Sequence, residues 1–433
     1  MRQAFVYRLY PSRTQERTME AILTTTCIFY NSLLVERKQA WEERKERVTK
    51  VQQLRRVKER KATNPYAASV HSHILQIVAD DLDKAFLAFF RRVRTGEKPG
   101  YPRFRGANRW TSFGLKELGN GFKLDGRRLK VSGVGRLSVR WHRPIEGDIK
   151  TVRISKKAGT WYAAFSCVAP DKDPLPATNR SIGIDVGLTH LLTTSDGETV
   201  EKMLLANPLP RVSGASNCMG SRVPPTRRRG SIEVRQQHLE NPRWYRAEQA
   251  TLRVVQRRIA RRKKGGNNRK KAVAQVQRQY ERITNRRKDY LNKLVADLVG
   301  SHDLIAIEDL RITHMARNRH LAKSILDAGW GYLADHLARK AACAGRWVSM
   351  VDPADTSKTC SGCGERLTQE ITLAARWVTC GSCGLSLDRD YNAAINILKR
   401  ARGASAQQPA RTSPLGVNVA GLPACVAQEA VPL

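Results

Sequence analysis

Four cysteines in the last fifth of the chain have the spacing of a metal site. Cys360 and Cys363 form one Cys-x2-Cys pair, and Cys380 and Cys383 form a second pair farther along the chain. Two such pairs can bring four thiolates to one tetrahedral ion, and this spacing is typical of a zinc ribbon. Because four thiolates leave no coordination position open, we expect one structural Zn²⁺ that stabilises the fold and takes no part in a reaction.

Three acidic residues stand where a buried charge would be costly. Asp185 ends the apolar segment SIGID, Glu308 ends the apolar segment LIAIE, and Asp390 precedes YNAAINIL. If two strand ends and one helix start meet at one sheet edge, these carboxylates could hold two Mg²⁺ ions about 3.5–4 Å apart and support phosphodiester hydrolysis. Simpler interpretations also stand, because each strand can simply reach the surface and Asp390 can cap a helix.

The charge of the chain indicates a polyanionic partner. Its 433 residues include 77 Lys and Arg against 39 Asp and Glu, so the formal net charge is +38. Such an excess favours nucleic acid. A membrane surface would also attract a basic protein, but we find no run of about 18 apolar residues and no signal peptide. We therefore expect no membrane association. The five cysteines outside the two pairs are scattered singly, which indicates a reducing, intracellular compartment.

The elements that must position these residues change in character along the chain. The pattern predicts a strand at residues 4–9, helices over 13–94, and short strands of a small barrel over 111–170. Residues 201–245 are irregular, and we interpret them as a loop or insertion. Residues 246–299 predict a basic helical hairpin. From Arg180 onward the order is two strands, long helices, strand, helix, strand and helix, which is consistent with a mixed sheet of the ribonuclease-H type.

Taken in order, the motifs resemble the TnpB family, the nucleases of insertion sequences, and their descendants, the compact type V CRISPR effectors. The resemblance covers residues 1–402 and includes LYPS near the start. The other segments that carry it are GYPRFR at 100–105, ISKKAGTWYAAF at 154–165, GIDVG around Asp185, IAIEDL around Glu308, SILDAGWG at 324–331, CSGCG with CGSCG, and DRDYNAAINI around Asp390.

The resemblance implies a multidomain α+β protein. Its RuvC/RNase H-like nuclease core would carry an inserted zinc ribbon, and its N-terminal wedge β-barrel would carry an inserted helical recognition lobe. The implied borders are 1–10 and 108–178 for the wedge barrel and 11–107 for the recognition lobe. The nuclease core would comprise 179–355 and 387–403, with 201–245 as an insertion or loop and 246–299 as the hairpin. Residues 356–386 would form the zinc ribbon or target nucleic-acid-binding module, and 404–433 a disordered tail.

The function that the resemblance implies is RNA-guided DNA cleavage. The family binds a guide RNA, reads a short motif beside its double-stranded DNA target, and forms an RNA–DNA heteroduplex. Its metal-binding acids fall on Asp185, Glu308 and Asp390, while Asp388 is expected to be structural or to support the site. We expect one nuclease site that cuts both strands in turn, in a monomer rather than a dimer, in a prokaryotic cytoplasm with nucleoid DNA as substrate.

Three alternatives remain open. The chain could be a non-cleaving RNA-guided DNA-binding repressor, although all three acids are present. It could be a compact type V CRISPR effector rather than a transposon-encoded nuclease. It could also be a transposase or a guide-independent Holliday-junction resolvase, but a small resolvase needs no recognition lobe.

Further residues are candidates for nucleic-acid contact. The hairpin turn is strongly basic, and the excess charge of the chain favours nucleic-acid contact there over a merely solvated face. The loop at 98–105 mixes cations with aromatic rings that could stack on bases or pack inside the fold. A glutamine on the second long helix could read adenine, or could be a simple exposed residue. These candidates are Ser72, Gln76, Tyr101, Arg103, Arg105, Arg261, Arg262, Lys263 and Lys264.

Overall fold

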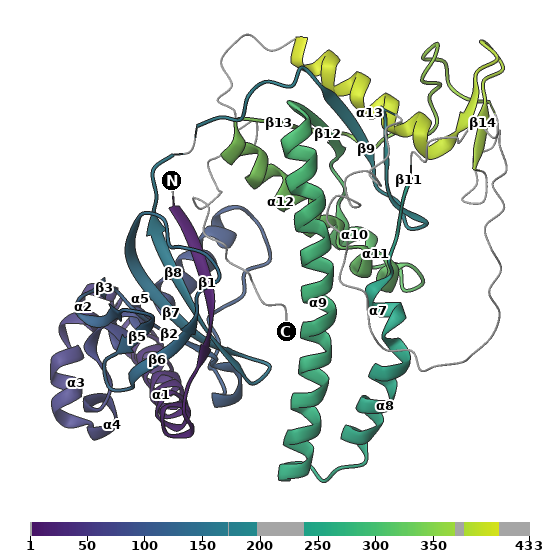
Figure 1. The fold of residues 1–433 in the computed structure, drawn as a ribbon. Coiled ribbons are helices and arrows are strands. Elements are labelled where there is room, and N and C mark those ends of the chain that lie inside the picture. Colours follow the sequence, from purple (N-terminus) through teal and green to yellow (C-terminus); the bar gives the residue numbers. More distant parts are fainter. Residues whose placement is uncertain (1, 172, 197–237, 369–375, 407–433) are drawn as a thin grey trace. The chain divides into compact units, whose positions relative to one another are not determined.

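The computed structural model describes residues 2–171, 173–196, 238–368 and 376–406 (Figure 1). The chain divides into two compact units, and the border follows Asp171. Most of the expected insertion, 201–237, and the expected tail from residue 407 lie outside the described residues. The same is true of two single cysteines, Cys218 and Cys425.

The first unit contains a curved eight-stranded sheet. Its strand order is β2-β7-β8-β1-β6-β5-β4-β3, with β1 between β8 and β6. The two end strands are consecutive in the chain, because only Lys116 separates β2, which pairs with β7, from β3, which pairs with β4. The strands are β1 (Arg2–Tyr10), β2 (Ser112–Leu115), β3 (Glu117–Leu118), β4 (Gly121–Asp125), β5 (Arg128–Val131), β6 (Gly135–Arg140), β7 (Asp148–Lys157) and β8 (Thr160–Val168).

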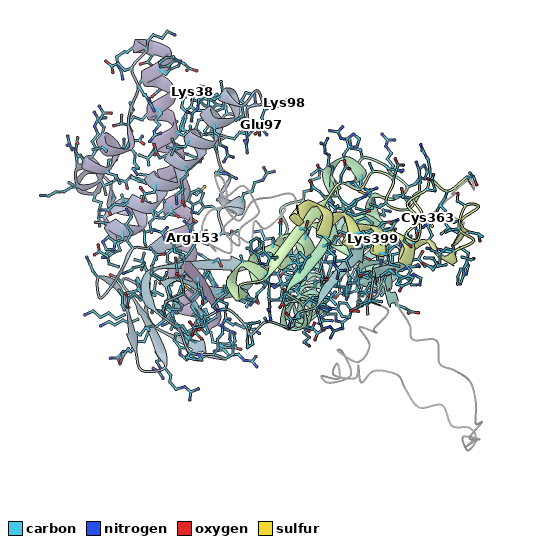
Figure 2. The ribbon with its side chains drawn as sticks, turned by 90° about the horizontal axis from the view of Figure 1, so that it is seen from above. Lys38, Glu97, Lys98, Arg153, Cys363 and Lys399 are labelled. Atoms are coloured by element: carbon cyan, nitrogen blue, oxygen red, sulfur yellow. The ribbon has the colours of Figure 1, made fainter. Side chains whose placement is uncertain are left out.

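Helices of the first unit share one hydrophobic core with the sheet. Leu33 and Leu82 from helices belong to the same buried cluster as Phe113 and Phe165 from strands. Arg153 of β7, labelled in Figure 2, donates to both carboxylate oxygens of Asp81 on α5 at 3.1 and 3.0 Å. The helices are α1 (Arg13–Arg44), α2 (Lys50–Arg55), α3 (Val57–Thr63), α4 (Pro65–Ala68), α5 (Ser72–Arg94) and the 3-10 turn η1 (Ala107–Arg109).

Helix α1 is, among the described residues, the one helix long and apolar enough to cross a membrane by length and composition. Half of its most apolar 18-residue window is buried inside the structure. Met19, Ile22 and Leu34 of this helix lie in the core of the first unit. Packing against the sheet therefore accounts for its apolar character.

The second unit is built on a five-stranded mixed sheet with the order β11-β10-β9-β12-β13. β9 (Ser181–Asp185), β12 (Leu304–Glu308) and β13 (Trp347–Val351) are parallel, and β10 (His190–Thr194) is antiparallel to β9. β11 (His238–Glu240) pairs with β10. This strand corrects our interpretation of 201–245 as loop throughout, since backbone pairing with β10 makes its last part an edge strand.

Helices cover both faces of this sheet. Ile305 and Ile307 of β12 pack in the cluster that includes helix α9, whereas Ala306 between them packs against Ile397 of α13 on the other face. Helices α8 and α9 form the basic hairpin (Figure 1). The helices are α7 (Trp244–Ala247), α8 (Gln249–Ala260), α9 (Asn267–Ser301), α10 (Ile312–Met315), α11 (Ala322–Ala328), α12 (Trp330–Ala344) and α13 (Arg389–Ala406).

The border between the two units lies seven residues before the expected border after residue 178. The N–H of Leu175 donates to the carbonyl of Ala344 at 2.9 Å, and the N–H of Thr178 donates to the carboxylate of Asp303 at 2.9 Å. These hydrogen bonds tie residues 175–178 to the second unit. The zinc-ribbon segment follows β13 and contains the two-stranded sheet of β14 (Trp377–Thr379) and β15 (Ser386–Asp388), directly before α13.

Candidate active site and metal centre

Two of the predicted acids leave the sheet at the same edge. Strands β9 and β12 are parallel, and Ile184 pairs with Ile307 in their register. Asp185 and Glu308 each follow these paired residues by one position, so both carboxylates stand at the carboxyl ends of adjacent strands. Glu308 is buried and Asp185 is half-buried. Parallel pairing therefore brings together two acids that are far apart in the sequence.

A glycine allows the third acid to reach this edge. A Cβ at Gly183 would lie 2.1 Å from the carbonyl oxygen of Ala394 and 2.9 Å from the Cβ of Leu398. Helix α13 can therefore pack directly on β9 only because this position has no side chain. Since α13 begins at Arg389, this packing places Asp390 close enough to Asp185 for their charges to interact.

Negative charge accumulates at the sheet edge. Burial raises the pKa of Asp185 well above its ordinary value, and the nearby charges of Glu308 and Asp390 raise it further. Burial also raises the pKa of Glu308. Both shifts mean that the ionised carboxylates lack full compensation by protein groups. A divalent cation would supply the missing positive charge.

The carboxylate of Asp390 is held by two arginines. Arg376 Nη1 donates to Oδ2 at 3.0 Å, and Arg389 Nη2 donates to Oδ1 at 2.9 Å. Arg376 also donates to the hydroxyl of Thr189, in the turn between β9 and β10. His190 Nδ1 lies 4.0 Å from Oδ2 of Asp390. Both oxygens of the third acid therefore face cationic side chains in this conformation.

Asp388 has the capping role that the sequence left open for Asp390. Oδ1 of Asp388 accepts hydrogen bonds from the N–H groups of Asp390 at 2.8 Å and Tyr391 at 3.1 Å. The first N–H groups of a helix have no partner within the helix, so Asp388 satisfies two of them for α13. The carboxylate of Asp390 makes ion pairs instead of a cap.

The three acids suit a magnesium site by the chemistry of their donors. All of their ligand atoms are carboxylate oxygens, which Mg²⁺ prefers. Across the described part of the chain, only the four cysteines form a group of three or more metal-binding side chains with all ligand atoms within 4.8 Å of one another. The acids are therefore spaced more widely in this conformation, and Asp390 would have to exchange an arginine for an ion in order to share a metal with Asp185 and Glu308.

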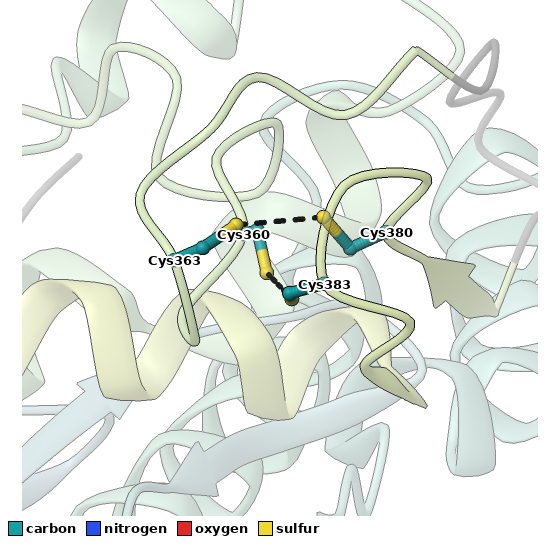
Figure 3. Close-up of side chains that lie close together, drawn as sticks. All are labelled: Cys360, Cys363, Cys380 and Cys383. Carbon is teal, nitrogen blue, oxygen red and sulfur yellow. Dashed lines mark hydrogen bonds between the residues drawn. The ribbon is translucent and has the colours of Figure 1, made fainter.

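The cysteine tetrad fits a zinc-binding site. The Sγ atoms of Cys360 and Cys383 lie 3.7 Å apart, and those of Cys363 and Cys380 lie 3.6 Å apart (Figure 3). Four sulfurs at about 2.3 Å from one tetrahedral Zn²⁺ would be about 3.8 Å from one another. These two distances match that value, and all four Sγ atoms lie within 4.8 Å of one another, so the tetrad is compact enough for a single ion.

Each Cys-x2-Cys pair folds into the same turn. The N–H groups of Gly364 and Gly384 donate to the carbonyl of the first cysteine of their pair, at 3.0 and 2.9 Å. Both glycines have positive φ, at 83° and 73°, where side chains are strained. Hydrogen bonds from the N–H groups of Cys383 and Ser382 lower the pKa of Cys380 to about 6. This shift favours the thiolate that zinc binds.

The segment that leads into the ribbon also touches the acids. The hydroxyl of Thr356 donates to Oε1 of Glu308 at 2.7 Å, and this contact is buried. Asn396 of α13 donates to the carbonyl of Thr356 at 2.8 Å. Asn392, one helical turn earlier, accepts from the N–H of Ser361 at 2.8 Å. These hydrogen bonds fasten the base of the ribbon to the helix that carries Asp390.

Models of known families match three segments of the chain. Residues 330–397 match the model described as "Cas12f1-like, TNB domain", residues 231–319 match "Probable transposase", and residues 1–46 match "Helix-turn-helix domain". In the structure, the described residues of this last segment form strand β1 and the long helix α1. The matches together span both units.

Similar proteins decide the family. A "TnpB-like protein" of Methanocaldococcus jannaschii is 30% identical over 135 residues, which are 31% of each chain. A "Putative RNA-guided DNA endonuclease" of Streptomyces pristinaespiralis is 33% identical over 415 residues, which are 94% of this chain and 91% of that protein. The chain belongs to the TnpB family.

A distant likeness to solved structures accompanies this assignment. The "mini-RNA-guided endonuclease CRISPR-Cas_phi3" aligns with 93% of this chain and 92% of its own, at 11% identity and a TM-score of 0.43. The assignment to TnpB rests on the sequence relatives and not on this likeness.

The remaining candidates of this TnpB-family chain lie away from the acids in the sequence and fall in both units. Ser72 is the first residue of α5 and accepts a hydrogen bond from Lys61 at 3.3 Å, and Gln76 on the same helix is half-buried rather than fully exposed. Tyr101 is 44% exposed, so it is not the buried core residue that one of our two interpretations required. Other exposed candidates are Arg103 and Arg105 in the loop, and Arg261, Arg262, Lys263 and Lys264 in the hairpin turn.

Sequence reasoning missed Thr356 and Arg376, which contact the acids of this TnpB-family site, and Asn392 and Asn396, which hold the segment that carries Thr356. Thr356 and Arg376 stand in segments without a local pattern, so no sequence signal marks them. Asn392 and Asn396 are different, because two asparagines four residues apart lie on one face of a helix. Two amides on an otherwise apolar face of α13 could have indicated a buried polar contact.

Proposed function

We propose that this chain is an RNA-guided DNA endonuclease with a single RuvC-like site. Membership of the TnpB family supports the class of activity. The observation that carries the proposal is the placement of Asp185, Glu308 and Asp390 at one sheet edge, where burial, and after it the nearby charges of the other two acids, raise the pKa of Asp185. Groups with strongly shifted pKa values that lie together are typical of catalytic sites.

Each acid has a defined task in this proposal. Asp185 and Glu308, fixed by adjacent parallel strands, would hold one side of a two-ion magnesium site, and Asp390 would complete it from α13. When bound, Mg²⁺ ions activate water and stabilise the leaving 3′ oxygen of a phosphodiester. The chain itself aligns the carboxylates through β9, β12 and the Asp388 cap, and Thr356 orients Glu308 by its hydrogen bond.

The basic charge of the chain supports nucleic-acid partners. A guide RNA paired with its DNA target is an A-form duplex that proteins bind mainly through the backbone, and a formal net charge of +38 suits that surface. We propose guide RNA and double-stranded target DNA as the partners of a monomer in a prokaryotic cytoplasm. In the same proposal the first unit comprises the wedge barrel and recognition lobe, and the cysteine tetrad holds a structural Zn²⁺ in the target-binding ribbon.

One experiment tests the proposal directly. The chain is purified with the RNA that it retains, the RNA is sequenced, and matched double-stranded DNA with randomised flanking bases is added with Mg²⁺. We expect cutting that depends on the match and on one flanking motif. Asp185→Ala should abolish cutting and keep RNA binding, whereas Asp309→Asn, which neutralises the exposed acid beside Glu308, should still cut. Intact matched DNA with the wild-type complex would contradict the proposal.

A second candidate function has one specific observation in its favour. Because Arg376 and Arg389 engage both oxygens of Asp390, a chain locked in this arrangement would bind RNA-guided targets without cutting them. The two functions differ in a simple assay. A nuclease converts bound target to product when Mg²⁺ is added, whereas a binding protein retains the target intact at every Mg²⁺ concentration.

A further inference from the structure

We propose that a cavity beside the acids seats one phosphodiester group of the DNA strand that is being cut. This inference rests on the proposed nuclease function. The cavity has a volume of about 110 Å³. Pockets for nucleotides and other cofactor-sized ligands are about 300–1,000 Å³, so this one has room for a small anionic group with its water rather than for a base or a cofactor.

The cavity adjoins the catalytic edge through a short chain of contacts. Leu188 and Thr189, in the turn that follows β9, form one wall. The hydroxyl of Thr189 accepts a hydrogen bond from Arg376, and the same guanidinium donates to Asp390 at 3.0 Å. One arginine side chain therefore separates the wall of the cavity from the proposed third metal ligand. A polynucleotide strand at the acids would pass this cavity within a few nucleotides.

Two exposed arginines line the cavity with polar partners. Arg246 donates to the hydroxyl of Ser324 at 2.8 Å, which holds its guanidinium at the cavity wall. The guanidinium of Arg243 has no hydrogen-bond or ion-pair partner within the described ranges of the chain. Asn241 positions the segment, because it accepts from the N–H of Arg243 at 3.1 Å and donates to the carbonyl of Leu188 at 3.2 Å.

The backbone of Arg243 is itself unusual. Its φ is 47° and its ψ is 51°, a left-handed conformation that is unfavourable for a residue with a long side chain. Strained residues of this kind concentrate at binding and catalytic sites, where the surrounding structure holds them. Here the strained residue lines the cavity with a guanidinium that has no partner among the described residues, and a planar arginine can bind two oxygens of one phosphate.

The acid in the cavity wall does not oppose an anion. Asp327 is almost fully buried and accepts from the N–H groups of Tyr245 at 2.8 Å and Arg246 at 3.4 Å. Arg287 lies 3.8 Å from its carboxylate. The charge of Asp327 is thus satisfied within the protein, and the lining retains the positive charge of Arg243 and Arg246. A phosphodiester complements this balance, and adjacency to the acids favours DNA over the guide RNA.

Interference by neutral phosphates tests the proposal in the full RNA-bound chain. Matched DNA substrates each carry one methylphosphonate, at successive positions around the cut. With the wild type we expect one position, a few nucleotides from the cut, to slow cleavage about 10-fold, the effect of one charge-assisted hydrogen bond. In Arg243→Gln with Arg246→Gln, cleavage should slow overall and this position should lose its effect. The control removes the same charge from two exposed arginines that do not line the cavity, Arg317→Gln with Arg319→Gln, and it should keep the wild-type interference pattern.

Binding without cleavage separates this proposal from the nuclease proposal. Affinity for single-stranded DNA is measured without added Mg²⁺, a condition that leaves zinc in the cysteine tetrad, at several salt concentrations. Loss of one phosphate contact should make the slope of log K against log salt shallower by about 0.7 in the double variant and not in its control. If the double variant folds poorly, Arg243→Gln alone takes its place, because this substitution removes no side-chain hydrogen bond or ion pair among the described residues. Its salt slope should also be shallower than that of the wild type.

The outcomes are distinct. If the wild type never cuts DNA but the salt slope is shallower in the double variant than in the wild type, the nuclease function is overturned and the cavity remains an anion site for DNA. An unchanged interference pattern and an unchanged slope overturn the cavity proposal while cutting persists. Interference from neutral phosphates in the guide RNA alone, rather than in the DNA, would also overturn it, because the cavity would then serve the guide.

Discussion

The hydroxyl of Thr356 donates a buried hydrogen bond of 2.7 Å to Oε1 of Glu308. This hydrogen bond lowers the pKa of Glu308 and so opposes the effect of burial. We expect Thr356→Val to cost about 1–3 kcal/mol of unfolding free energy, because a buried charged group loses its donor. Cleavage should also fall, and its pH profile should move to higher pH because Glu308 ionises later. Thr356→Ser keeps the hydroxyl and should restore both; an unchanged profile in the valine variant would refute this role.

The raised pKa of Asp185 predicts a pH-dependent stability. Between the ordinary pKa of about 3.9 and the raised value, the folded chain binds more protons than the unfolded chain, so stability falls as pH rises through this window. Without added Mg²⁺, Asp185→Asn should therefore be more stable than wild type at neutral pH, and its stability should depend less on pH. Denaturant unfolding at several pH values measures this, and the exposed neighbour variant Asp309→Asn should follow the wild type.

We expect Arg376 to compete with Mg²⁺ for the carboxylate of Asp390. Its guanidinium donates to Oδ2 of Asp390 at 3.0 Å, and its side chain is 38% exposed. A partly exposed ion pair of this kind contributes about 0.5–1 kcal/mol to the stability of the conformation in which it forms. We expect Arg376→Gln to lower the Mg²⁺ concentration for half-maximal cleavage about 2- to 5-fold. Arg366→Gln removes another arginine of the ribbon, 74% exposed, and should leave the Mg²⁺ requirement unchanged. A higher requirement in Arg376→Gln would show that Arg376 assists metal binding.

Gly183 is required for the close packing of α13 on β9. A methyl group there would lie 2.1 Å from a backbone oxygen, which cannot move without the helix. We expect Gly183→Ala to lower the free energy of unfolding by about 1–3 kcal/mol. The substitution should also displace Asp390, so cleavage should be lost. Gly300 in α9 offers a control, since a Cβ there meets nothing within 4 Å. Gly300→Ala should stabilise by about 0.5–1 kcal/mol and keep activity; equal behaviour of the two alanine variants would contradict the packing argument.

Zinc should be bound at one ion per chain and should be needed for cleavage. The cysteine ribbon precedes α13 directly, and Asn392 and Asn396 join the two. Cys380→Ser should abolish stoichiometric zinc in metal analysis of the purified chain, destabilise the second unit and reduce cutting. Cys343→Ala lies outside the tetrad and should retain one ion. Full activity of a zinc-free chain would contradict a role of the ribbon in placing Asp390.

Several features could be predicted because they depend on local spacing. Short turns bring the four cysteines together in an arrangement that fits one ion, so Cys-x2-Cys pairs specify the tetrad before any fold is known. Strands ending at Asp185 and Glu308 follow from apolar runs of strand length. The three-residue strand β11 could not be predicted, because its segment is polar and irregular and only pairing with β10 makes it a strand.

Local spacing in the sequence was enough to select the candidate residues: four thiols at zinc spacing, three acids at element ends and an excess of positive charge. How these candidates are arranged relative to one another follows from the folded structure alone. Parallel register puts Asp185 beside Glu308, close packing at Gly183 brings α13 to β9, and Asp388 rather than Asp390 caps that helix. Thr356 and Arg376 enter the site in the same way. These relations join residues far apart in the chain, so they depend on packing geometry, which no local spacing encodes.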